Sequence, residues 1–225
     1  MSKIFYVCSY GGSGSTMLCN ALLPYGKVFH IHSRNPPEKL EYVGNDAGGN
    51  TSDLWFNGKQ IPEDQLHKYH VIFIYKNPIH CIYSRFLNAW HLKHIQSPNC
   101  SLQEVLQQNK DLYGIEEFYN NYTTFNNKRN YKIYSIKYED IFEKQTALSR
   151  LFNIGPLNLV KMESNRTYNT EEVNQLKLIY KNLLETQNNN SFIMVNHKHI
   201  SIPKTHIYVK KQNKKKHFLN KINFY

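Results

Sequence analysis

Residues 3–16 read KIFYVCSYGGSGST, and this stretch decides the fold. Its first seven residues are mostly apolar and predict a buried strand, and the glycines that follow predict a tight turn. The next apolar residues recur at helical spacing, at Met17, Leu18, Ala21 and Leu22. A strand, loop and helix in this order present backbone N–H groups at the positive end of the helix. We therefore predict a phosphate-binding loop at residues 11–16.

Two further apolar runs predict strands, at residues 28–32 and 71–75. The second run, VIFIY, is unbroken, which suits a strand buried on both faces. Asn77 and Pro78 then predict the start of a helix, with Asn77 as its N-cap. The apolar positions of this helix are Ile79, Ile82, Tyr83, Phe86, Leu87 and Trp90.

The rest of the chain continues the alternation of strands and helices. Helices are predicted at residues 101–108, 114–125 and 139–152, and a last one from Thr170 to the asparagines at 188–190. A further strand is predicted at residues 131–136. Alternation of this kind predicts an α/β fold with a mostly parallel sheet between helices, a three-layer sandwich that binds ligands at the carboxyl ends of its strands. We assign this domain to residues 1–190 and treat 191–225 as a C-terminal extension with a basic tail.

The composition narrows the class of protein. With 225 residues, of which 40% are hydrophobic, the chain has enough apolar side chains for one well-packed domain. No run approaches the roughly 18–20 apolar residues of a membrane helix, and the first residues lack the plan of a secretory signal. We therefore expect a cytoplasmic protein with no membrane partner.

Lys and Arg number 28 against 17 Asp and Glu, a formal charge of +11 that favours an anionic partner.

The four cysteines show no spacing typical of a disulfide framework or a zinc site. We expect Cys8, Cys19, Cys81 and Cys100 to be reduced, and we expect no metal. Nucleic acid is not an expected partner, because the KKQNKKK core of the tail contains no aromatic residues and matches no binding motif. If the tail did bind nucleic acid, deleting residues 210–225 would abolish the binding.

The loop departs from the nucleotide-triphosphatase pattern GxxxxGK[ST]. Ser9 stands for the first glycine and Ser15 for the lysine, and only Gly14 and Thr16 match. An ATP-hydrolysing function is therefore disfavoured.

Ser13-Gly14-Ser15-Thr16 instead resembles the loop of the sulfotransferases that use 3′-phosphoadenosine 5′-phosphosulfate (PAPS). A second signature of that family is a strand ending in arginine, then Asn-Pro, then a serine eight residues after the arginine. Lys76-Asn77-Pro78 with Ser84 is similar to it. A third is a strand ending in Arg/Lys-Tyr-Glu-Asp-Leu, which residues 137–141, KYEDI, resemble. The three occur in the family's order over residues 3–155.

The resemblance implies the P-loop-like sulfotransferase fold and a cofactor site for PAPS, whose product is 3′-phosphoadenosine 5′-phosphate (PAP). It implies that the loop binds phosphate and that Lys76 and Ser84 hold the cofactor's 3′-phosphate. Arg166 matches a late basic segment that covers the same phosphate in the family. The residues expected to bind the cofactor are Gly11, Gly12, Ser13, Gly14, Ser15, Thr16, Lys76, Ser84 and Arg166.

The family supplies a base, commonly histidine or glutamate, and a loop cation. We expect His32 to be the base, with His30 second, because both lie at the carboxyl end of the second strand, where alternation points them to the same side, and His32 is nearer its end. Gly12 occupies the place of the loop cation, and Lys76 keeps the charge but loses the bidentate fork of arginine. Arg34 is expected to bind substrate or to orient the cofactor.

The resemblance predicts sulfuryl transfer to a hydroxyl or amine. The acceptor, a small molecule, a glycan or a peptide, is expected near residues 41–64, a long segment without clear periodicity. Two alternatives stay open. One is a catalytically inactive nucleotide-binding protein of the same fold, and the other is an ATP-dependent small-molecule kinase.

Overall fold

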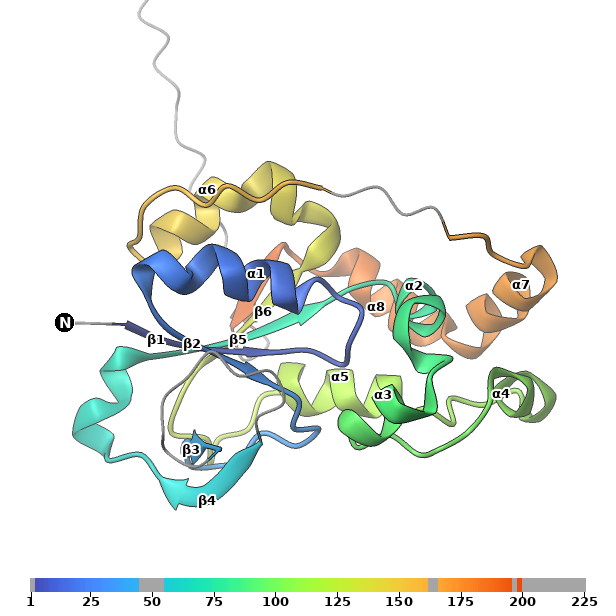
Figure 1. Ribbon diagram of the computed structural model, residues 1–225, viewed down its shortest axis with the longest axis horizontal. Helices are drawn as coiled ribbons and strands as arrows, with labels where there is room; N and C mark the ends of the chain where they lie inside the picture. Colours follow the sequence, from blue (N-terminus) through green and yellow to red (C-terminus); the bar gives the residue numbers. More distant parts are fainter. Residues whose placement is uncertain (1–2, 45–54, 162–165, 196–197, 200–225) are drawn as a thin grey trace, which may run out of the picture.

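The computed structural model describes residues 3–44, 55–161, 166–195 and 198–199. Its centre is a six-stranded sheet in the order β2-β1-β5-β6-β7-β8 (Figure 1). The first four strands in this order are parallel, and β7 and β8 are antiparallel to their neighbours. The strands are β1 (Lys3–Cys8), β2 (Gly26–Ile31), β5 (Tyr69–Tyr75), β6 (Ile133–Lys137), β7 (Ile193–Val195) and β8 (Lys198–His199).

Helices cover both faces of the sheet, as the alternation of strands and helices predicts (Figure 1). On one face, α1 (Ser15–Leu22) and α6 (Ile141–Leu151) bury Leu18, Leu22 and Leu148 against the sheet. On the other face, α5 (Ile115–Thr123) packs with α7 (Thr170–Ile179) and α8 (Lys181–Asn189). The prediction of an α/β fold with a mostly parallel sheet is confirmed.

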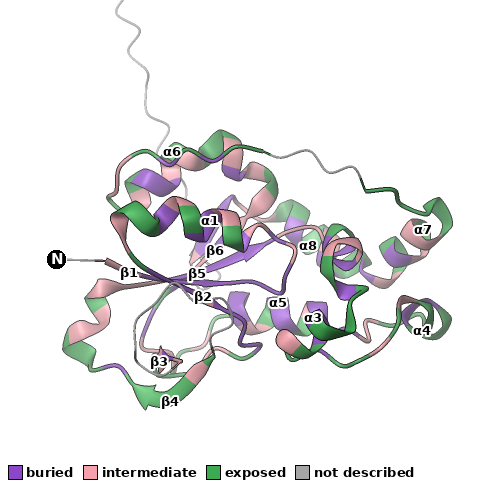
Figure 2. Ribbon diagram, in the orientation of Figure 1, coloured by how far each residue is buried: buried purple, intermediate pink, exposed green. Residues whose placement is uncertain are grey.

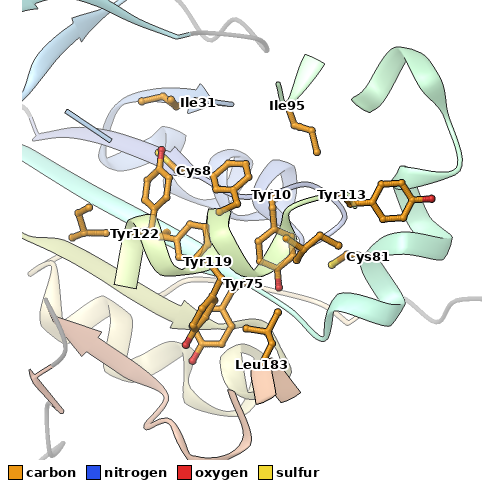
Figure 3. Packing of buried hydrophobic residues seen from close by; sticks show 14 of the residues in the cluster. Cys8, Tyr10, Ile31, Tyr75, Cys81, Ile95, Tyr113, Tyr119, Tyr122 and Leu183 are labelled. Atoms are coloured by element: carbon orange, nitrogen blue, oxygen red, sulfur yellow. The ribbon is translucent and has the colours of Figure 1, made fainter. Parts of the chain in front are cut away.

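The strands β1 and β5 are buried along most of their length (Figure 2). Both core clusters draw on β5, because Phe73 and Tyr75 face one layer of helices while Ile72 and Ile74 face the other. The layer on the α5 side is rich in tyrosine, with Tyr10, Tyr75, Tyr119 and Tyr122 packed beneath the sheet (Figure 3). Cys8, Cys19 and Cys81 are buried free thiols, as expected.

The helix predicted after Asn77 is broken into three parts, which corrects the prediction of one continuous helix. They are α2 (Pro78–Cys81), a π-helical turn, η3 (Ile82–Phe86), and α3 (Ala89–His94). Asn77 is the N-cap, since its Oδ1 accepts from the N–H of Ile79 at 2.9 Å. A second cap at Asn88 restarts the helix, and the break leaves Trp90 66% exposed although the periodicity predicted that it would be buried.

Other elements lie outside the predicted pattern. The segment 41–64 contains a separate antiparallel pair, β3 (Glu41–Val43) and β4 (Phe56–Gln60), while its residues 45–54 fall outside the described part. The last predicted helix is divided at Tyr180 into α7 and α8. Strand β7 lies beyond the boundary predicted at residue 190 and pairs with β6. The remaining elements are η1 (Leu23–Tyr25), η2 (Glu63–Lys68), α4 (Leu102–Gln108) and η4 (Tyr138–Asp140).

Candidate functional site

Four parallel strands end at one edge of the sheet, and the sequence motifs follow these ends directly. The order β2-β1-β5-β6 places β1 beside both β2 and β5, so the chain changes direction across the sheet at the end of β1. Open α/β sheets bind ligands at such a switch point. Helices α2 and α3 lie at the same end (Figure 1). The site below is therefore built from the segments that follow β1, β2, β5 and β6.

The loop after β1 has the backbone of an anion cradle. Gly11, Gly12 and Gly14 have φ angles of +93°, +70° and +81°, in the left-handed region that favours glycine. Successive N–H groups in such a backbone form a concave nest for anions. The loop is also held internally, because Ser9 Oγ accepts from the N–H of Gly11 at 3.2 Å and donates to Ser15 Oγ at 3.0 Å. Helix α1 begins at Ser15, directly after the loop.

The second motif packs directly against this loop. A Cβ added at Gly12 would lie 3.1 Å from Ser84 Cβ and 3.2 Å from the backbone Cα of Cys81. Ser13 Oγ lies 3.5 Å from Cys81 Sγ, and burial raises the pKa of the Cys81 thiol to about 12. Ser84 belongs to the π-helical turn, which is a common feature of functional sites. The structure thus brings Ser84, the predicted phosphate ligand, to the loop.

Lys76 and the third motif complete the same edge. Lys76 Nζ lies 4.3 Å from the centre of the Tyr138 ring, a cation–π contact. A Cβ on Gly14 would approach Tyr138 Cε2 to 2.5 Å, so the ring covers the loop closely. Glu139 Oε1 accepts from the N–H of Asn77 at 2.9 Å, which joins the ends of β5 and β6. The loop, the end of β5 and the end of β6 therefore form one continuous surface.

The histidines at the end of β2 lie beside the loop. His30 Nε2 and Ser15 Oγ are hydrogen-bonded at 2.8 Å, so His30 is tied to the loop itself. The rings of His30 and His32 lie 4.2 Å apart, and His32 lies 4.3 Å from His94 of α3. His32 is 5% exposed, and burial, followed by the charges of nearby histidines and of Arg85, lowers its pKa to about 2. The His32 imidazole is therefore neutral at pH 7.

Arg34 has a different environment from the one the sequence suggested. It is buried, and its guanidinium donates to the carbonyl oxygens of Gly114 at 2.6 Å and Tyr113 at 3.0 Å. Its Nε donates to the carbonyl of Gln96 at 3.2 Å, and Glu117 forms an ion pair with it at 3.6 Å. These contacts anchor α5 and the end of α3 to the end of β2. These contacts give Arg34 a structural role, and its expected part in binding substrate stays a prediction.

Arg166 lies at the first residue described after the gap at 162–165. Its charge lowers the pKa of the Cys81 thiol, whose raised value is set mainly by burial, so the guanidinium lies within electrostatic range of α2. Two residues later, Tyr168 packs edge-to-face on Tyr83 at 4.9 Å and contacts His80 at 5.7 Å. The segment that carries Arg166 therefore runs along α2 and the π-helical turn, next to Ser84.

The structure adds residues that the sequence did not single out. The ring of His91 lies against Gly11, so that its Nε2 occupies the space a side chain on Gly11 would need. Trp90 stacks on His94 at 4.9 Å with an 18° angle between the rings, and Trp55 packs edge-on against His94 at 5.6 Å. The run AWHLKH at 89–94 was the available signal, but it reads as an ordinary helix segment. Only the break before α3 turns His91 towards the loop.

The comparisons with known proteins give no assignment. No protein-family model matches the chain, and neither the curated proteins nor the solved structures gave a match. Within residues 3–44, 55–161, 166–195 and 198–199, no three His, Cys, Asp or Glu side chains are grouped to hold a metal ion. In the same part of the chain, no helix has both the length and the apolar character needed to cross a membrane.

Proposed function

We propose that the chain is a PAPS-dependent sulfotransferase with the P-loop-like fold of that family. The observation that carries the proposal is the meeting of three distant segments at one edge of the sheet. Gly12 touches Ser84, Gly14 touches Tyr138, and Lys76 lies over the Tyr138 ring. A glycine loop with positive φ angles beside a lysine and a serine hydroxyl is suited to a ligand that carries two separate phosphate groups.

Each residue has a defined task in this proposal. The loop at residues 11–16 binds the 5′-phosphate through backbone N–H groups other than that of Gly11, which donates to Ser9 Oγ. Lys76 and Ser84 bind the 3′-phosphate, and Arg166 covers it. PAPS supplies the sulfuryl group: its S–O bond to the 5′-phosphate breaks, sulfur bonds to the acceptor's oxygen or nitrogen, and the electron pair stays on PAP. His32, or His30 as the second choice, takes the acceptor's proton. The lowered pKa leaves the His32 imidazole neutral at pH 7, but it also weakens the imidazole as a base, because an effective general base has a pKa near the working pH.

The acceptor is proposed to bind beside the histidines. Trp55 belongs to the segment 41–64, which was expected to shape the acceptor site, and its contact with His94 brings this segment next to His32. Trp90, which is 66% exposed, stacks on the same His94 ring at 4.9 Å. An aromatic surface next to the proposed base is compatible with a small molecule, a glycan or a peptide side chain.

A ligand-binding experiment tests the cofactor site. We expect PAP to stabilise the protein against heat more than adenosine 5′-phosphate or ATP does, by about 2.7 kcal/mol at a hundredfold excess over its Kd. Replacing Lys76 or Ser84 with Ala is expected to weaken PAP binding about 10- to 100-fold, because each loses a hydrogen bond to a charged group. Lys68→Ala is the matched control, since Lys68 precedes β5 and Lys76 follows it. Equal stabilisation by all three nucleotides would contradict the proposal.

A second candidate function is a nucleotide-binding protein without transferase activity. It is favoured by Gly12, which stands where the family has its loop cation and where a Cβ would be crowded by Ser84 and Cys81. Transfer of radiolabelled sulfate from PAPS to a panel of acceptors separates the two functions. Turnover that is lost in His32→Ala would exclude the inactive protein. Tighter binding of ATP than of PAP would instead favour the small-molecule kinase.

A further inference from the structure

His91 is a buried imidazole next to the phosphate-binding loop. The residue is 7% exposed, and its Nε2 is buried with no hydrogen-bond partner in the described part of the chain. Buried polar groups are almost always hydrogen-bonded, because an unpaired donor or acceptor costs free energy. The same nitrogen lies against Gly11, in the space that any side chain at that position would occupy. An unpaired, buried imidazole nitrogen beside the loop is available to hydrogen-bond an anion that the loop binds.

The neighbouring residue of the loop, Gly12, supplies no cation to the bound phosphate. Position 12 carries no side chain, and a Cβ there would crowd Ser84 Cβ at 3.1 Å and the Cα of Cys81 at 3.2 Å. A cation that offsets charge on the bound phosphate therefore cannot come from position 12 itself. The side chains and backbone nearest to the Cβ positions of the two glycines belong to Ser84, Cys81 and His91. Of these, the Cys81 thiol is held protonated by burial, and Ser84 is assigned to the 3′-phosphate.

We propose that His91 donates a hydrogen bond from Nε2 to the phosphate group held by residues 11–16, and so supplies from α3 the stabilisation that position 12 lacks. The proposal rests on the proposed function for the identity of that group, the 5′-phosphate of PAPS. Negative charge develops on this phosphate when the S–O bond breaks, and a positioned donor stabilises it. The donor is fixed before the ligand arrives, since Phe86 packs edge-on against the His91 ring at 6.0 Å.

The electrostatics fit a neutral donor. Burial, the charge of Arg85 and then His94 lower the pKa of His91 to about 4, so the ring carries a single N–H at pH 7. A neutral imidazole can place this proton on Nε2 and donate it to an oxyanion. Arg85 follows Ser84 directly and lowers the pKa of both His91 and His32, so it adds a positive field on the same side of the loop.

The test observes the NMR signals of the His91 imidazole directly. Long-range ¹H–¹⁵N NMR spectra of the full chain are recorded with PAP, ATP or inorganic pyrophosphate, and the His91 signals are assigned from His91→Gln. We expect the Nε2 signal to shift on binding and its proton to become protected from exchange. His91→Gln, which keeps an N–H donor, is expected to bind within about threefold of the wild type. His91→Leu, similar in volume, is expected to bind about 10- to 100-fold more weakly.

The outcomes separate this inference from the proposed function. If PAP binds without changing the His91 signals, the inference is overturned and the PAPS site stands. If ATP or pyrophosphate shifts the His91 signals and PAP does not bind, the inference stands and the PAPS site is overturned. If none of the three ligands binds, both are overturned. The signals of the wild-type protein decide the matter even if His91→Leu fails to fold.

Discussion

Gly14 shows how one residue sets both the shape of the loop and its contact with the next motif. Its φ of +81° costs an L-residue about 1–2 kcal/mol, and a Cβ there would approach the Tyr138 ring to 2.5 Å. Gly58 in β4 has a similar φ of +83° but nothing within 4 Å of its Cβ position. Alanine substitutions at these two glycines therefore distinguish the free-energy cost of backbone strain alone from the cost of strain together with steric overlap.

We predict that Gly14→Ala destabilises the protein more than Gly58→Ala does. Gly58→Ala is expected to cost about 1–2 kcal/mol for the backbone alone, and Gly14→Ala a further 1–3 kcal/mol, roughly, for overpacking against Tyr138. Urea unfolding at pH 7 measures both values. Equal losses in the two variants would show that Tyr138 moves aside freely and that it does not fix the loop.

His32 makes a prediction about pH. Its folded pKa is about 2 and its ordinary value is 6.5, so below pH 6.5 the unfolded chain takes up a proton that the folded protein does not. The stability linked to neutral His32 is therefore present above pH 6.5 and is lost as the pH falls, by at most about 1.4 kcal/mol per pH unit. We expect His32→Gln to flatten the decline in the free energy of unfolding between pH 6 and pH 4. An unchanged slope would mean that His32 is readily protonated in the fold.

At the scale of elements, the strands and the loop were predictable because their residues carry strong local signals. KIFYVC and VIFIY are apolar runs that only a doubly covered sheet buries, and the glycines between β1 and α1 mark the turn. Strand β4 was not predictable, since Asn57, Lys59 and Gln60 are exposed and give no alternation of apolar residues. Pairing with β3, rather than burial, makes this segment a strand.

The break in the helix after β5 shows where local signals are insufficient. Periodic apolar residues from Ile79 to Trp90 predict one helix, but the π-helical turn changes the rotation per residue and Asn88 starts a new cap. The positions of Lys76 and Ser84 were predictable because they lie before or within the first turns. His91 was not, because its approach to Gly11 depends on the direction of α3 after the break.

Arg34 illustrates a second limit of the sequence at this scale. An arginine three residues after a strand is a reasonable ligand for an anion. Its environment in the fold comes from α5, whose N-terminal residue Gly114 and neighbour Tyr113 present carbonyl oxygens to Arg34. These residues lie some 80 positions away in the chain, so the contact follows from the packing of the helix under the sheet.

At the scale of the whole molecule, the C-terminal part of the domain completes the layer beneath the site. Gln187 of α8 donates to the Tyr10 hydroxyl at 3.3 Å, and the same hydroxyl accepts from the N–H of Lys76 at 3.0 Å. Tyr10 also donates to the carbonyl oxygen of Lys76. Helix α8 therefore supports the residue that fixes the end of β5, and the site depends on a segment more than 100 residues further along the chain.

The stability of the fold also depends on strand β7, which lies past the domain boundary predicted at residue 190. Phe192, Ile193 and Met194 are 4%, 2% and 2% exposed, and β7 pairs with the edge of β6. Each side chain stabilises the fold by about 1.5–3 kcal/mol through burial, which together approaches the roughly 5–15 kcal/mol by which domains are stable. Removal would also leave the backbone groups of β6 unpaired at the edge of the sheet.

We therefore predict that a chain ending at residue 190 is unfolded or aggregates, while a chain ending at residue 199 keeps a cooperative unfolding transition. The two truncations differ only by the segment that carries β7 and β8, so the comparison isolates the strands from the rest of the C-terminal region. Circular dichroism during thermal unfolding, with size-exclusion chromatography, distinguishes the results. A chain 1–190 as stable as 1–199 would mean that β6 tolerates an open edge and that the domain ends at α8.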